Sequence, residues 1–570
     1  MLFKVFCACL DGLEIHSIII EVVVSDGIQF FLVGLPDSAV KESQQRIGGA
    51  LASCGYRIPG KRIVVNMAPA NIRKEGSSFD VGIGIGILAA SAQISVTQDV
   101  LNRFFILGEL ALDGSIREIQ GALPIAMRAI EEGFQALILP FESALECVEF
   151  EDIDIYAVRV LPEVVDILTN PCAASHLLVR NCAKSKLSGF STTAKEMANN
   201  GKECAAAEDE YDFSMIKGQL QARRALEIAA GGGHNLIMNG SPGSGKTFMA
   251  KCLKTILPPL SKEEAMQTSV IYSVAGLLGG ISNGGLLKQR PFRAPHHTIT
   301  VAALVGGGSK GLPGEISLAH NGVLFLDEFG EFERKALEVL RQPMEEGVIH
   351  ISRVRARYTY PANFMLVAAM NPCPCGKFYD SMNDCTCTPY AISRYRAKVS
   401  GPLFDRIDIQ LKISTLTSSE IIGKSGADSA IAEAQTPQTA EPSRVIAKRV
   451  AVARQIQKLR FTNEGVFTNA RMNNRLIKKY CSLSEECEVI MNHLVDKMGF
   501  SYRAYTRILK IARTIADMEI AKAIAEADIP LNASLSVLEQ TIKERFGLSF
   551  ELSANHILEA AKYRFMDREQ

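Results

Sequence analysis

Along the first part of the chain, hydrophobic and polar residues follow both the pattern of β-strands and the pattern of α-helices, as in a mixed α/β domain. Short runs rich in β-branched residues, such as IHSIIIEVVV from Ile15 and RIVVNMA from Arg62, predict strands. Between them, SAVKESQQRIGGALASCG from Ser38 and PIAMRAIEEG from Pro124 carry apolar residues at helical spacing. We therefore expect an α/β or α+β domain over residues 1–170.

Two polar stretches interrupt this pattern and predict linkers. Residues 171–210 are rich in Ser, Ala, Lys and Glu with little apolar periodicity, and residues 415–444 have a similar character. The segment 211–414 again mixes strand-like and helical runs, which predicts a second α/β domain. From residue 445, runs such as RVAVARQIQKLRF and RAYTRILKIARTIAD repeat apolar residues every three or four positions, so residues 445–570 are expected to form a helical domain.

Length and charge limit the classes of protein to which the chain can belong. At 570 residues it exceeds a single domain, and 62 Lys+Arg against 62 Asp+Glu leave no net charge, so any nucleic-acid contact needs a local basic patch. The N-terminal run to Ile20 lacks a signal-peptide cleavage pattern and predicts a first strand. The run VGIGIGILAASAQI from Val81 is too short and Gly-rich to span a bilayer comfortably. We expect no membrane segment and a cytoplasmic protein whose 14 cysteines are reduced or bind metal.

The stretch NLIMNGSPGSGKTFMA has the form of a phosphate-binding loop between a strand and a helix. Glycines let backbone N–H groups close around phosphate oxygens at the helix N-terminus, where the dipole favours negative charge. Lys246 is expected to reach the β- and γ-phosphates of ATP, and the Thr247 hydroxyl to ligate Mg²⁺. The candidate nucleotide-binding residues are Gly240, Ser241, Pro242, Gly243, Ser244, Gly245, Lys246 and Thr247.

Later strand ends carry polar residues suited to ATP hydrolysis. HNGVLFLDEF ends in Asp327, a candidate Mg²⁺ ligand, and Glu328, a candidate general base, although an acidic pair there can also be a helix cap. The strand NFMLVAAMN ends in Asn371, which either orients the attacking water or forms a turn. Arg406, in SGPLFDRID, is either an arginine finger into a neighbouring subunit or a surface salt bridge.

Four cysteines lie in two Cys-x-Cys pairs within NPCPCGKFYDSMNDCTC. They could bind Zn²⁺ as a Cys₄ knot, with Gly376 allowing a tight turn, although the one-residue spacer is shorter than usual. A zinc site, a metal-free turn and a redox switch therefore stay open as readings. The candidate zinc ligands are Cys373, Cys375, Cys385 and Cys387. Cysteines in apolar surroundings are expected to be buried, and these are Cys7, Cys9, Cys481 and Cys487.

Arginines occupy alternate positions in ISRVRARYTYP, at Arg353, Arg355 and Arg357. In a strand they would project from one face, and such a row of guanidinium groups suits contacts with DNA phosphates. A solvated hairpin face is the alternative. His296 and His297, in PFRAPHHTIT, cannot easily share a metal because they are adjacent, and we interpret them as polar loop contacts.

Together these motifs resemble those of one family. GSPGSGKT, PFRAPHHTIT, GLPGEISLAHNGVLFLDE, AAMNPCPCG, SGPLFDRID and RAYTRILKIARTIAD are similar to motifs of the Mg-chelatase-like AAA+ ATPases of the YifB/ComM group, and the similarity covers nearly the whole chain. The resemblance implies an α/β protein with an N-terminal Lon-protease-like α+β domain of the ribosomal S5 domain 2 type. A central AAA+ P-loop α/β core and a C-terminal helical lid of the Mg-chelatase type would follow.

The resemblance also implies roles for single residues and a function. Asn371 would be sensor 1, Arg406 the arginine finger and Arg503 sensor 2, with Arg507 as the second choice for that role. The chain would form a homo-hexamer that uses ATP and Mg²⁺ to move single-stranded, forked or branched DNA, as a helicase for branch migration in natural transformation. An ATP-driven protein remodeller without DNA translocation, like the subunit that serves metal insertion into porphyrins, is the alternative.

An ATP-dependent protease is the third reading, and the sequence weakens it. By resemblance Ser78 takes the position of the Lon-type nucleophile, which needs a lysine of lowered pKa beside it. No lysine occurs between Lys74 and Lys184, and QGALPIAMR, near Ile125, where it is expected, offers no base. We therefore interpret Ser78 as a helix N-cap and expect no peptidase activity.

Overall fold

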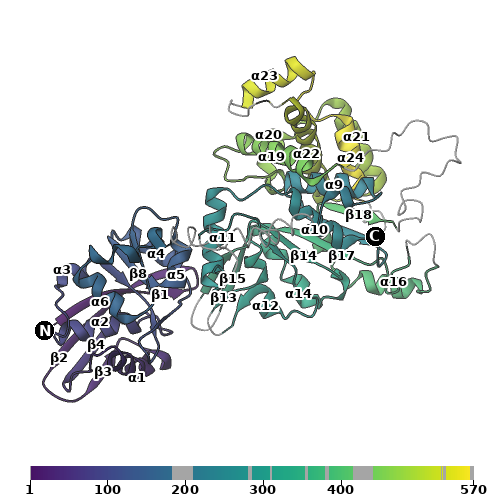
Figure 1. Ribbon diagram of the computed structural model, residues 1–570. Helices are drawn as coiled ribbons and strands as arrows, with labels where there is room; N and C mark the ends of the chain where they lie inside the picture. Colours follow the sequence, from purple (N-terminus) through teal and green to yellow (C-terminus); the bar gives the residue numbers. More distant parts are fainter. Residues whose placement is uncertain are drawn as a thin grey trace.

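The chain folds into an N-terminal α+β part, a central α/β part and a C-terminal helical part. In the computed structural model these lie at the left, in the centre and at the top of Figure 1. This mixed architecture is the fold class predicted from the sequence. The described residues are 2–182, 210–279, 285–308, 311–352, 357–378, 384–414, 441–527, 529 and 535–564.

A seven-stranded mixed sheet organises the N-terminal part, in the order β3-β4-β2-β1-β5-β8-β9. The first two strands form a long antiparallel hairpin, whereas β1, β5, β8 and β9 run parallel. The N-terminal apolar run is therefore two strands, because Gly12 reverses the chain at a φ of +67° that favours glycine. The strands of this sheet are β1 Leu2–Asp11, β2 Glu14–Ser25, β3 Phe30–Val33, β4 Arg62–Ala68, β5 Phe104–Ile106, β8 Ala136–Pro140 and β9 Asp154–Val158, and a small hairpin pairs β6 Glu109–Leu110 with β7 Ile116–Arg117.

Helices cover both faces of this sheet. Side chains alternate along β1, so that Val5 and Cys7 pack in the core around α2 whereas Ala8 packs in the core around α4. The apolar run at Val81 is the buried helix α2, and none of the helices in the described ranges is long and apolar enough to cross a membrane. The helices are α1 Ser38–Ser53, α2 Asp80–Ala90, α3 Gln98–Leu101, α4 Ala122–Glu131, α5 Phe141–Ala144 and α6 Leu161–Thr169, with the 3-10 turns Leu145–Cys147 and Ala173–Leu177.

The prediction that Ser78 caps the helix that follows it is wrong. Helix α2 begins after Phe79, and no side chain caps it. The carbonyl of Ser78 instead accepts a hydrogen bond from the Gly108 N–H, and the first turn carries Asp80, whose carboxylate suits the helix N-terminus. Arg46 holds that carboxylate at 2.7 Å, so the helix start is stabilised by a charge rather than by a hydroxyl.

The central part is built on a five-stranded sheet in which every paired strand runs parallel, in the order β11-β14-β17-β10-β18. Its strands read as continuous apolar runs because helices cover both faces. Met238 packs under α9 and α10, and the next residue back, Ile237, packs on the opposite face. The strands are β10 Leu236–Gly240, β11 Phe292–Arg293, β14 Val323–Leu326, β17 Met365–Met370 and β18 Ile409–Ile413.

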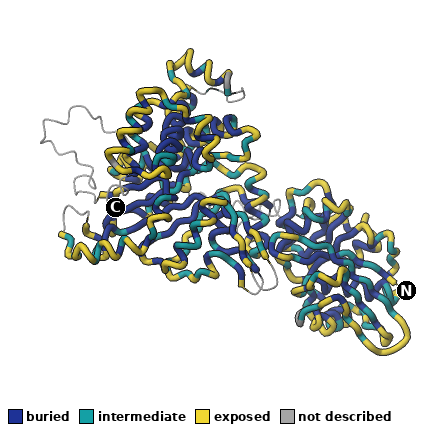
Figure 2. The backbone as a smooth tube through the Cα atoms, turned by 180° about the vertical axis from the view of Figure 1, so that it is seen from behind, coloured by how far each residue is buried: buried dark blue, intermediate teal, exposed yellow. Residues whose placement is uncertain are grey.

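Helices and two small hairpins complete the central part, whose buried strands are the dark interior in Figure 2. The hairpins are β12 Gly306–Gly307 with β13 Leu312–Pro313, and β15 Val348–Ser352 with β16 Arg357–Pro361. The helices are α9 Leu220–Gly232, α10 Lys246–Ile256, α11 Lys262–Val274, α12 Val301–Val305, α13 Glu315–Leu318, α14 Arg334–Glu338, α15 Arg341–Glu346, α16 Pro389–Arg396 and α17 Gly401–Phe404.

The C-terminal part is helical, as the sequence predicts, and shares one hydrophobic core with α9 and α10. Its long central helix, α22, packs against α19, α24 and α9. A buried ion pair between Arg460 and Asp517, at 2.5 Å, ties α19 to α22. The helices are α19 Ser443–Arg460, α20 Asn474–Tyr480, α21 Glu485–Met498, α22 Tyr502–Ala527, α23 Leu535–Phe546 and α24 Ala554–Lys562.

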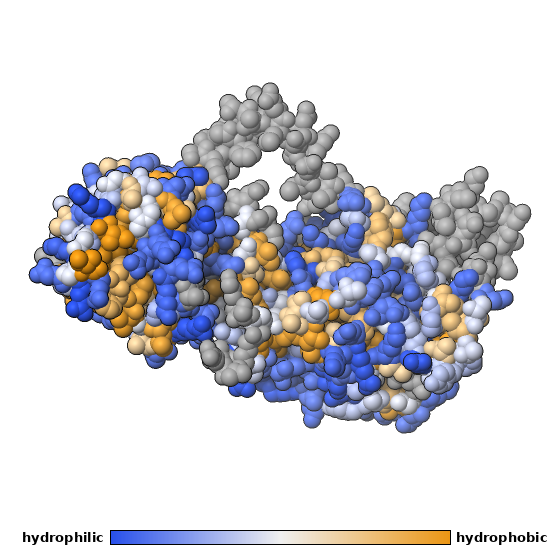
Figure 3. Space-filling view, turned by 90° about the horizontal axis from the view of Figure 1, so that it is seen from below, coloured by the Kyte–Doolittle hydropathy of each residue, from blue (hydrophilic) through white to orange (hydrophobic). Residues whose placement is uncertain are grey.

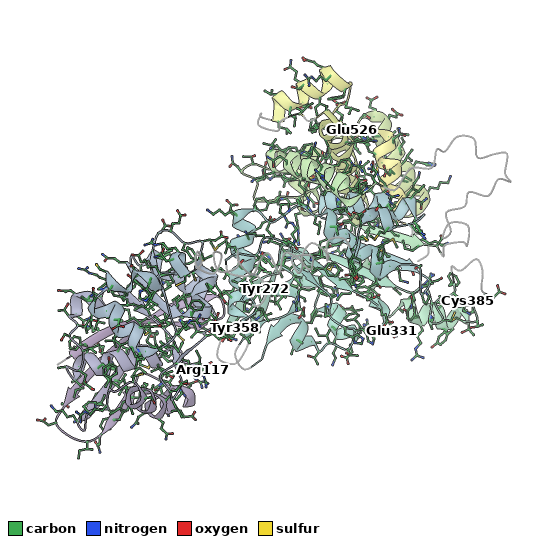
Figure 4. The ribbon with its side chains drawn as sticks, in the orientation of Figure 1. Arg117, Tyr272, Glu331, Tyr358, Cys385 and Glu526 are labelled. Carbon is green, nitrogen blue, oxygen red and sulfur yellow. The ribbon has the colours of Figure 1, made fainter. Side chains whose placement is uncertain are left out.

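The N-terminal part packs on helix α11 of the central part through one shared hydrophobic core. Ser273 joins them, because its carbonyl accepts the Gly121 N–H at 3.0 Å and its hydroxyl donates to Glu146 at 2.5 Å. The turn at Gly12 lies against the Tyr358 ring, which faces the N-terminal part in Figure 4. From below, the surface is largely hydrophilic, with apolar side chains gathered in patches on both parts (Figure 3).

Candidate active site

The phosphate-binding loop connects β10 to α10, as the motif predicts. Gly243 and Gly245 adopt φ angles of +78° and +85°, which favour glycine. A Cβ added at either position would meet open space, so the loop needs glycine for its backbone conformation and not for lack of room. The N-terminus of α10 thereby faces a cavity of about 370 Å³. Its lining residues are Pro242, Gly243, Ser244, Gly245, Lys246, Thr247, Phe248, Asp327, Glu328, Ala369 and Asn371.

Lys246 is the buried cation of this cavity. Its Nζ donates to the carbonyls of Gly240 at 2.6 Å and Ser241 at 2.9 Å, and to Asn371 Oδ1 at 3.3 Å. Burial lowers its pKa to about 8, although the nearby Asp327 carboxylate acts in the opposite direction. A buried ammonium group at the start of a helix is a fitting partner for phosphate oxygens.

Thr247, at the start of helix α10, and Asp327, directly after strand β14, form an oxygen pair. The Thr247 hydroxyl donates to Asp327 Oδ2 at 2.7 Å, although the two residues are distant in sequence. Hard oxygen donors of this kind, a hydroxyl and a carboxylate, are what Mg²⁺ prefers beside a nucleotide. The donor set therefore fits the predicted magnesium ion.

Glu328 follows Asp327 in an unusual backbone conformation. Its φ of +51° lies in the left-handed region, which is uncommon for a residue with a side chain and often marks functional sites. Asp327 Oδ1 accepts its backbone N–H at 2.9 Å and holds the turn. The Glu328 side chain is 54% exposed and lines the cavity. It makes no capping hydrogen bond to the 3-10 turn Phe329–Glu331 that follows.

Asn371 directly follows strand β17, which lies between β14 and β10 in the sheet. Because the carboxyl ends of parallel strands meet at one edge, its amide reaches the same cavity as Glu328 and the phosphate-binding loop. It accepts from Lys246 in the contact described above. The structure thus brings five of the predicted site residues to one cavity, namely Lys246, Thr247, Asp327, Glu328 and Asn371.

The four cysteines of the Cys-x-Cys pairs converge. Their sulfur atoms all lie within 4.8 Å of one another, with Cys373 Sγ 3.3 Å from Cys375 Sγ and 3.6 Å from Cys385 Sγ. Sulfurs ~3.8 Å apart are expected around a tetrahedral ion with Zn–S bonds of ~2.3 Å. Hydrogen bonds from the Lys377 backbone N–H and then from Cys373 lower the pKa of Cys375 to about 6, whereas the pKa values of Cys385 and Cys387 lie above the usual thiol value. The cluster is thus compatible with Zn²⁺, and Cys385 lies far from the N-terminal part in Figure 4.

The cysteine turn also packs against the phosphate-binding loop. A Cβ added at Gly376 would come within 2.4 Å of the Pro242 Cδ atom. Gly376 has a φ of +76°, so both its conformation and this close approach require glycine.

Two predicted arginines lie in ion pairs within the chain. Arg406 is buried, with its NH2 group 2.5 Å from Glu345 Oε1 and its NH1 group donating to the Pro402 carbonyl at 2.6 Å. Arg503, at the start of α22, is 56% exposed and 4.0 Å from Asp405 Oδ2. Within the described chain, neither lines the cavity of the phosphate-binding loop.

The predicted basic row lies only partly within the described residues. Arg357 is an exposed residue at the start of β16, whereas Arg353 and Arg355 fall outside the described ranges. The four cysteines expected in apolar surroundings are buried, which confirms that prediction.

The family described as magnesium chelatase, subunit ChlI, matches residues 212–421, its C-terminal family matches 440–534, and the family of subunit ChlI of Mg-chelatase matches 20–143. YifB of Salmonella typhimurium LT2 is 38% identical over 98% of this chain and 96% of its own, and YifB of Escherichia coli K12 is 37% identical over 98% and 96%. Competence protein ComM of Haemophilus influenzae Rd is 40% identical over 89% of this chain and 92% of its own.

The chain belongs to the Mg-chelatase-like YifB/ComM family. The resemblance stated from the motifs is therefore confirmed, and the central part fits the AAA+ core of this family. Family membership indicates ATPase activity.

Two contacts at the site, one made by His297 and one by Gly376, were not predicted from the sequence. His297, interpreted as a polar loop contact, places its Nδ1 atom 2.9 Å from Glu328 Oε2. His297 follows β11, the sheet neighbour of β14, and the order of strands was the missing information. The contact of Gly376 with Pro242 likewise joins segments that no sequence pattern relates.

A buried network connects the core to the helical part behind the site. Arg507, the second choice for sensor 2, lies 2.6 Å from Asp408 Oδ1, and His234 lies 3.1 Å from Asp408 Oδ2. Burial alone would raise the pKa of Asp408, but Arg507 and His234 outweigh it and hold that pKa well below its usual range. Asp408 therefore stays charged and links α22 to the strand β18.

Proposed function

We propose that the chain is the subunit of a homo-hexameric, ATP-driven DNA motor that promotes branch migration of recombination intermediates. The observation that carries the proposal is the cavity in which the phosphate-binding loop, the Thr247–Asp327 oxygen pair and the Glu328 carboxylate meet. A relative that is 40% identical to this chain over 509 aligned residues is named a competence protein, which supports a competence-related role.

ATP binding would replace the hydrogen bonds that Lys246 makes to backbone carbonyls of the phosphate-binding loop. The N–H groups at the start of α10 and the Lys246 ammonium would bind the phosphate oxygens, which take the place of the Gly240 and Ser241 carbonyls. Thr247 and Asp327 would hold Mg²⁺, which supplies positive charge to the phosphates when bound.

Hydrolysis would then follow as an in-line displacement by water. Glu328 would take a proton from the water as its oxygen attacks the γ-phosphorus, and the bond from that phosphorus to the β–γ bridging oxygen breaks. Asn371, at the end of β17, would orient the water from the side of Lys246.

Two arginines are proposed to respond to bound nucleotide, one of them across the interface between subunits. We propose Arg406 as the finger that reaches a neighbour's γ-phosphate, which requires a closed ring of subunits. In the single chain this guanidinium pairs with Glu345, so ring assembly would exchange that carboxylate for a phosphate. Arg503, exposed at the start of α22, is proposed as sensor 2, reporting the nucleotide to the helical part.

DNA would be bound along the β15–β16 hairpin. Arg357 is exposed at the start of β16, opposite Ser352 of β15, and would contact DNA phosphates. Arg353 and Arg355, the other two arginines proposed for DNA, lie outside the described residues. Such contacts are independent of sequence and sensitive to salt, as a motor that moves along any duplex requires.

We further propose that the four cysteines bind one structural Zn²⁺. The supporting observation is the close approach of the four sulfur atoms. Zinc would fix the turn at Gly376 against Pro242, and so the chain between Asn371 and Arg406.

A protein remodeller without DNA translocation is the second candidate. The family descriptions that match the chain name magnesium chelatase, an observation that favours this reading. Such a protein would use the same ATP site but would not respond to DNA.

The two candidates differ in how ATP turnover responds to DNA. We expect forked DNA to raise the ATPase rate of the purified protein, and the Arg357→Ala variant to need more DNA and to lose stimulation at lower salt. The exposed Arg103, in the N-terminal part, provides the matched control Arg103→Ala, which should behave like the unchanged protein. ATP turnover that ignores DNA would favour the remodeller, and no turnover would refute both.

A further inference from the structure

A second cavity lies in the helical part, between the helices α20, α21 and α22 that are labelled near the top of Figure 1. Its volume is about 600 Å³, within the range of cavities that bind small molecules, and it shares no lining residue with the cavity of the phosphate-binding loop. Its buried lining is apolar and includes Ile477, Phe500 and Leu509. The proposed ATPase reaction makes no use of this cavity.

Two tyrosine rings also line this cavity. Tyr502 and Tyr505 lie one turn apart at the start of α22, with ring centroids 6.2 Å apart and ring planes inclined by only 13°. Tyr502 is 65% exposed, although an aromatic ring is a large apolar surface. Within the described chain, neither tyrosine hydroxyl forms a hydrogen bond. The cavity thus carries an exposed aromatic surface that is suited to stacking with another flat ring.

Four exposed polar side chains form the rim of the cavity. Asn474 and Lys478 come from α20, and Glu488 and Asn492 come from α21. Among the residues that the structure describes, none of these four side chains forms a hydrogen bond or an ion pair. Lys478 and Glu488 have opposite charges, so the rim has no net charge. The hydrogen-bonding groups of the rim are therefore available to a ligand.

These features favour a flat aromatic ring whose edge carries hydrogen-bond donors and acceptors. An aliphatic side chain of a partner protein would fill the apolar lining but would leave the amides of Asn474 and Asn492 without partners. A nucleobase offers both a π-face for stacking and a polar edge. Because the rim is neutral, attraction of phosphate groups would contribute little to binding here.

We propose that this cavity binds an unpaired nucleobase of single-stranded DNA, stacked on Tyr502 and Tyr505 with its polar edge against Glu488 and Asn492. A free nucleotide carries the same base and is the other source of this chemistry. The inference deepens the proposed function, on which it rests for the identity of the DNA. The helical part would hold an unpaired base of a fork or branch while the core hydrolyses ATP.

The Glu488 carboxylate gives the cavity a preference among bases. An ionised carboxylate only accepts hydrogen bonds, so it suits the amino group of cytosine and not the O4 atom of thymine, which is itself an acceptor. Cytosine and thymine are similar in size, which makes them a matched pair. We expect a strand of cytosines to bind about five- to tenfold more tightly than a strand of thymines.

Binding of short fluorescent single strands of cytosine or thymine to the purified protein, measured by anisotropy, tests the proposal. A salt concentration of about 0.3 M weakens phosphate contacts such as those proposed for Arg357. Tyr502→Leu keeps apolar bulk but removes the flat ring, and should weaken binding of the cytosine strand about five- to tenfold, whereas Tyr502→Phe should stay within about twofold. Glu488→Gln should remove the preference for cytosine, because an amide also donates to thymine O4.

Two controls and one competition complete the experiment. Tyr390→Leu, at a tyrosine of α16 that is 77% exposed, should leave strand binding unchanged. Tyr502→Leu should keep its basal ATPase rate, which shows that this variant is folded. Deoxycytidine monophosphate that competes only at much higher concentration than the cytosine strand assigns the cavity to DNA. Equally strong competition would support the nucleobase site and assign it to free nucleotides.

Equal binding of the cytosine strand by the unchanged protein and by Tyr502→Leu would overturn the proposal, as would a cytosine preference that persists in Glu488→Gln. The proposed function fails separately, when forked DNA does not change the ATPase rate of the unchanged protein. Weaker strand binding in Tyr502→Leu, with binding retained in Tyr502→Phe, would still establish the nucleobase site in that case.

Discussion

Lys246 illustrates how a single residue prepares the site for its substrate. Its ammonium group is buried and its pKa is lowered to about 8 by that burial, so it still carries a charge at neutral pH. The carbonyls of Gly240 and Ser241 satisfy this charge in the protein alone. Phosphate oxygens carry full negative charge and are stronger partners than carbonyls, which gives the exchange its direction.

The roles of Glu328 and Arg406 can be tested together, because the proposed ring would place them on opposite sides of one interface between subunits. Glu328→Gln should bind ATP normally but lose at least about 100-fold in kcat, since amide cannot take the proton. Arg406→Ala should lose turnover to a similar extent. When the two inactive variants are mixed and allowed to assemble, interfaces with an intact Glu328 and an intact Arg406 should restore part of the activity.

The measurement is the ATPase rate of the mixture against the sum of the separate rates. Glu331→Gln is the matched control for the glutamate, because Glu331 pairs with Lys398 at 3.0 Å and should turn ATP over normally. A mixture no more active than its components would refute an interface shared by these two residues.

At the scale of elements, periodicity and turn residues predicted several strands and helices of the described chain. The runs from Arg62 and Ser38 became β4 and α1, and the acidic and amide strand ends reached one edge of a parallel sheet. The contacts of His297 with Glu328 and of Gly376 with Pro242 were not predictable, because periodicity reports which face of an element is apolar and not which element it meets. Ser78 was misplaced for a related reason, since Asp80 and Arg46 stabilise that helix start.

Zinc content tests the cysteine turn as an element. Protein purified without a chelator should contain about one zinc per chain, and the double variant Cys375→Ser with Cys385→Ser should contain none. Gly376 packs on Pro242 of the phosphate-binding loop, so loss of the metal should loosen this contact. We expect ATP binding to become weaker by a factor of about three to ten, the size expected for the loss of one packing contact.

Elemental analysis and nucleotide titration measure the two effects. Cys172→Ser, at an exposed cysteine of the N-terminal part, is the matched control and should change neither. Unchanged ATP binding in zinc-free protein would refute the coupling, and zinc-free protein from a chelator-free preparation would refute the site.

At the scale of the whole molecule, Glu146 connects pH to the packing of the N-terminal part on the core. Burial raises its pKa from 4.5 to about 7, although the Ser273 hydroxyl acts in the opposite direction. A raised carboxyl pKa means that the folded state prefers the protonated group. The interface is therefore most stable below about pH 4.5 and loses stability as the pH rises through about 7, by about 3 kcal/mol in total.

Glu146→Gln should remove this loss, because a glutamine can accept from Ser273 without a charge. We expect a higher Tm than in the unchanged protein at pH 8.5, by several degrees, and no difference at pH 5. Glu149→Gln, at an exposed neighbour, should have no effect at either pH. Calorimetry at both values measures the difference, and a Tm gain that is the same at pH 5 and pH 8.5 would contradict the assignment to Glu146.

We propose that the assembled molecule converts ATP hydrolysis into movement of branched DNA. The most direct measurement follows a synthetic four-way DNA junction with homologous arms, mixed with the purified protein and ATP. We expect the junction to be converted into two duplexes in a reaction that requires ATP and that fails with the Glu328→Gln variant. A junction that stays intact while the protein hydrolyses ATP would contradict it.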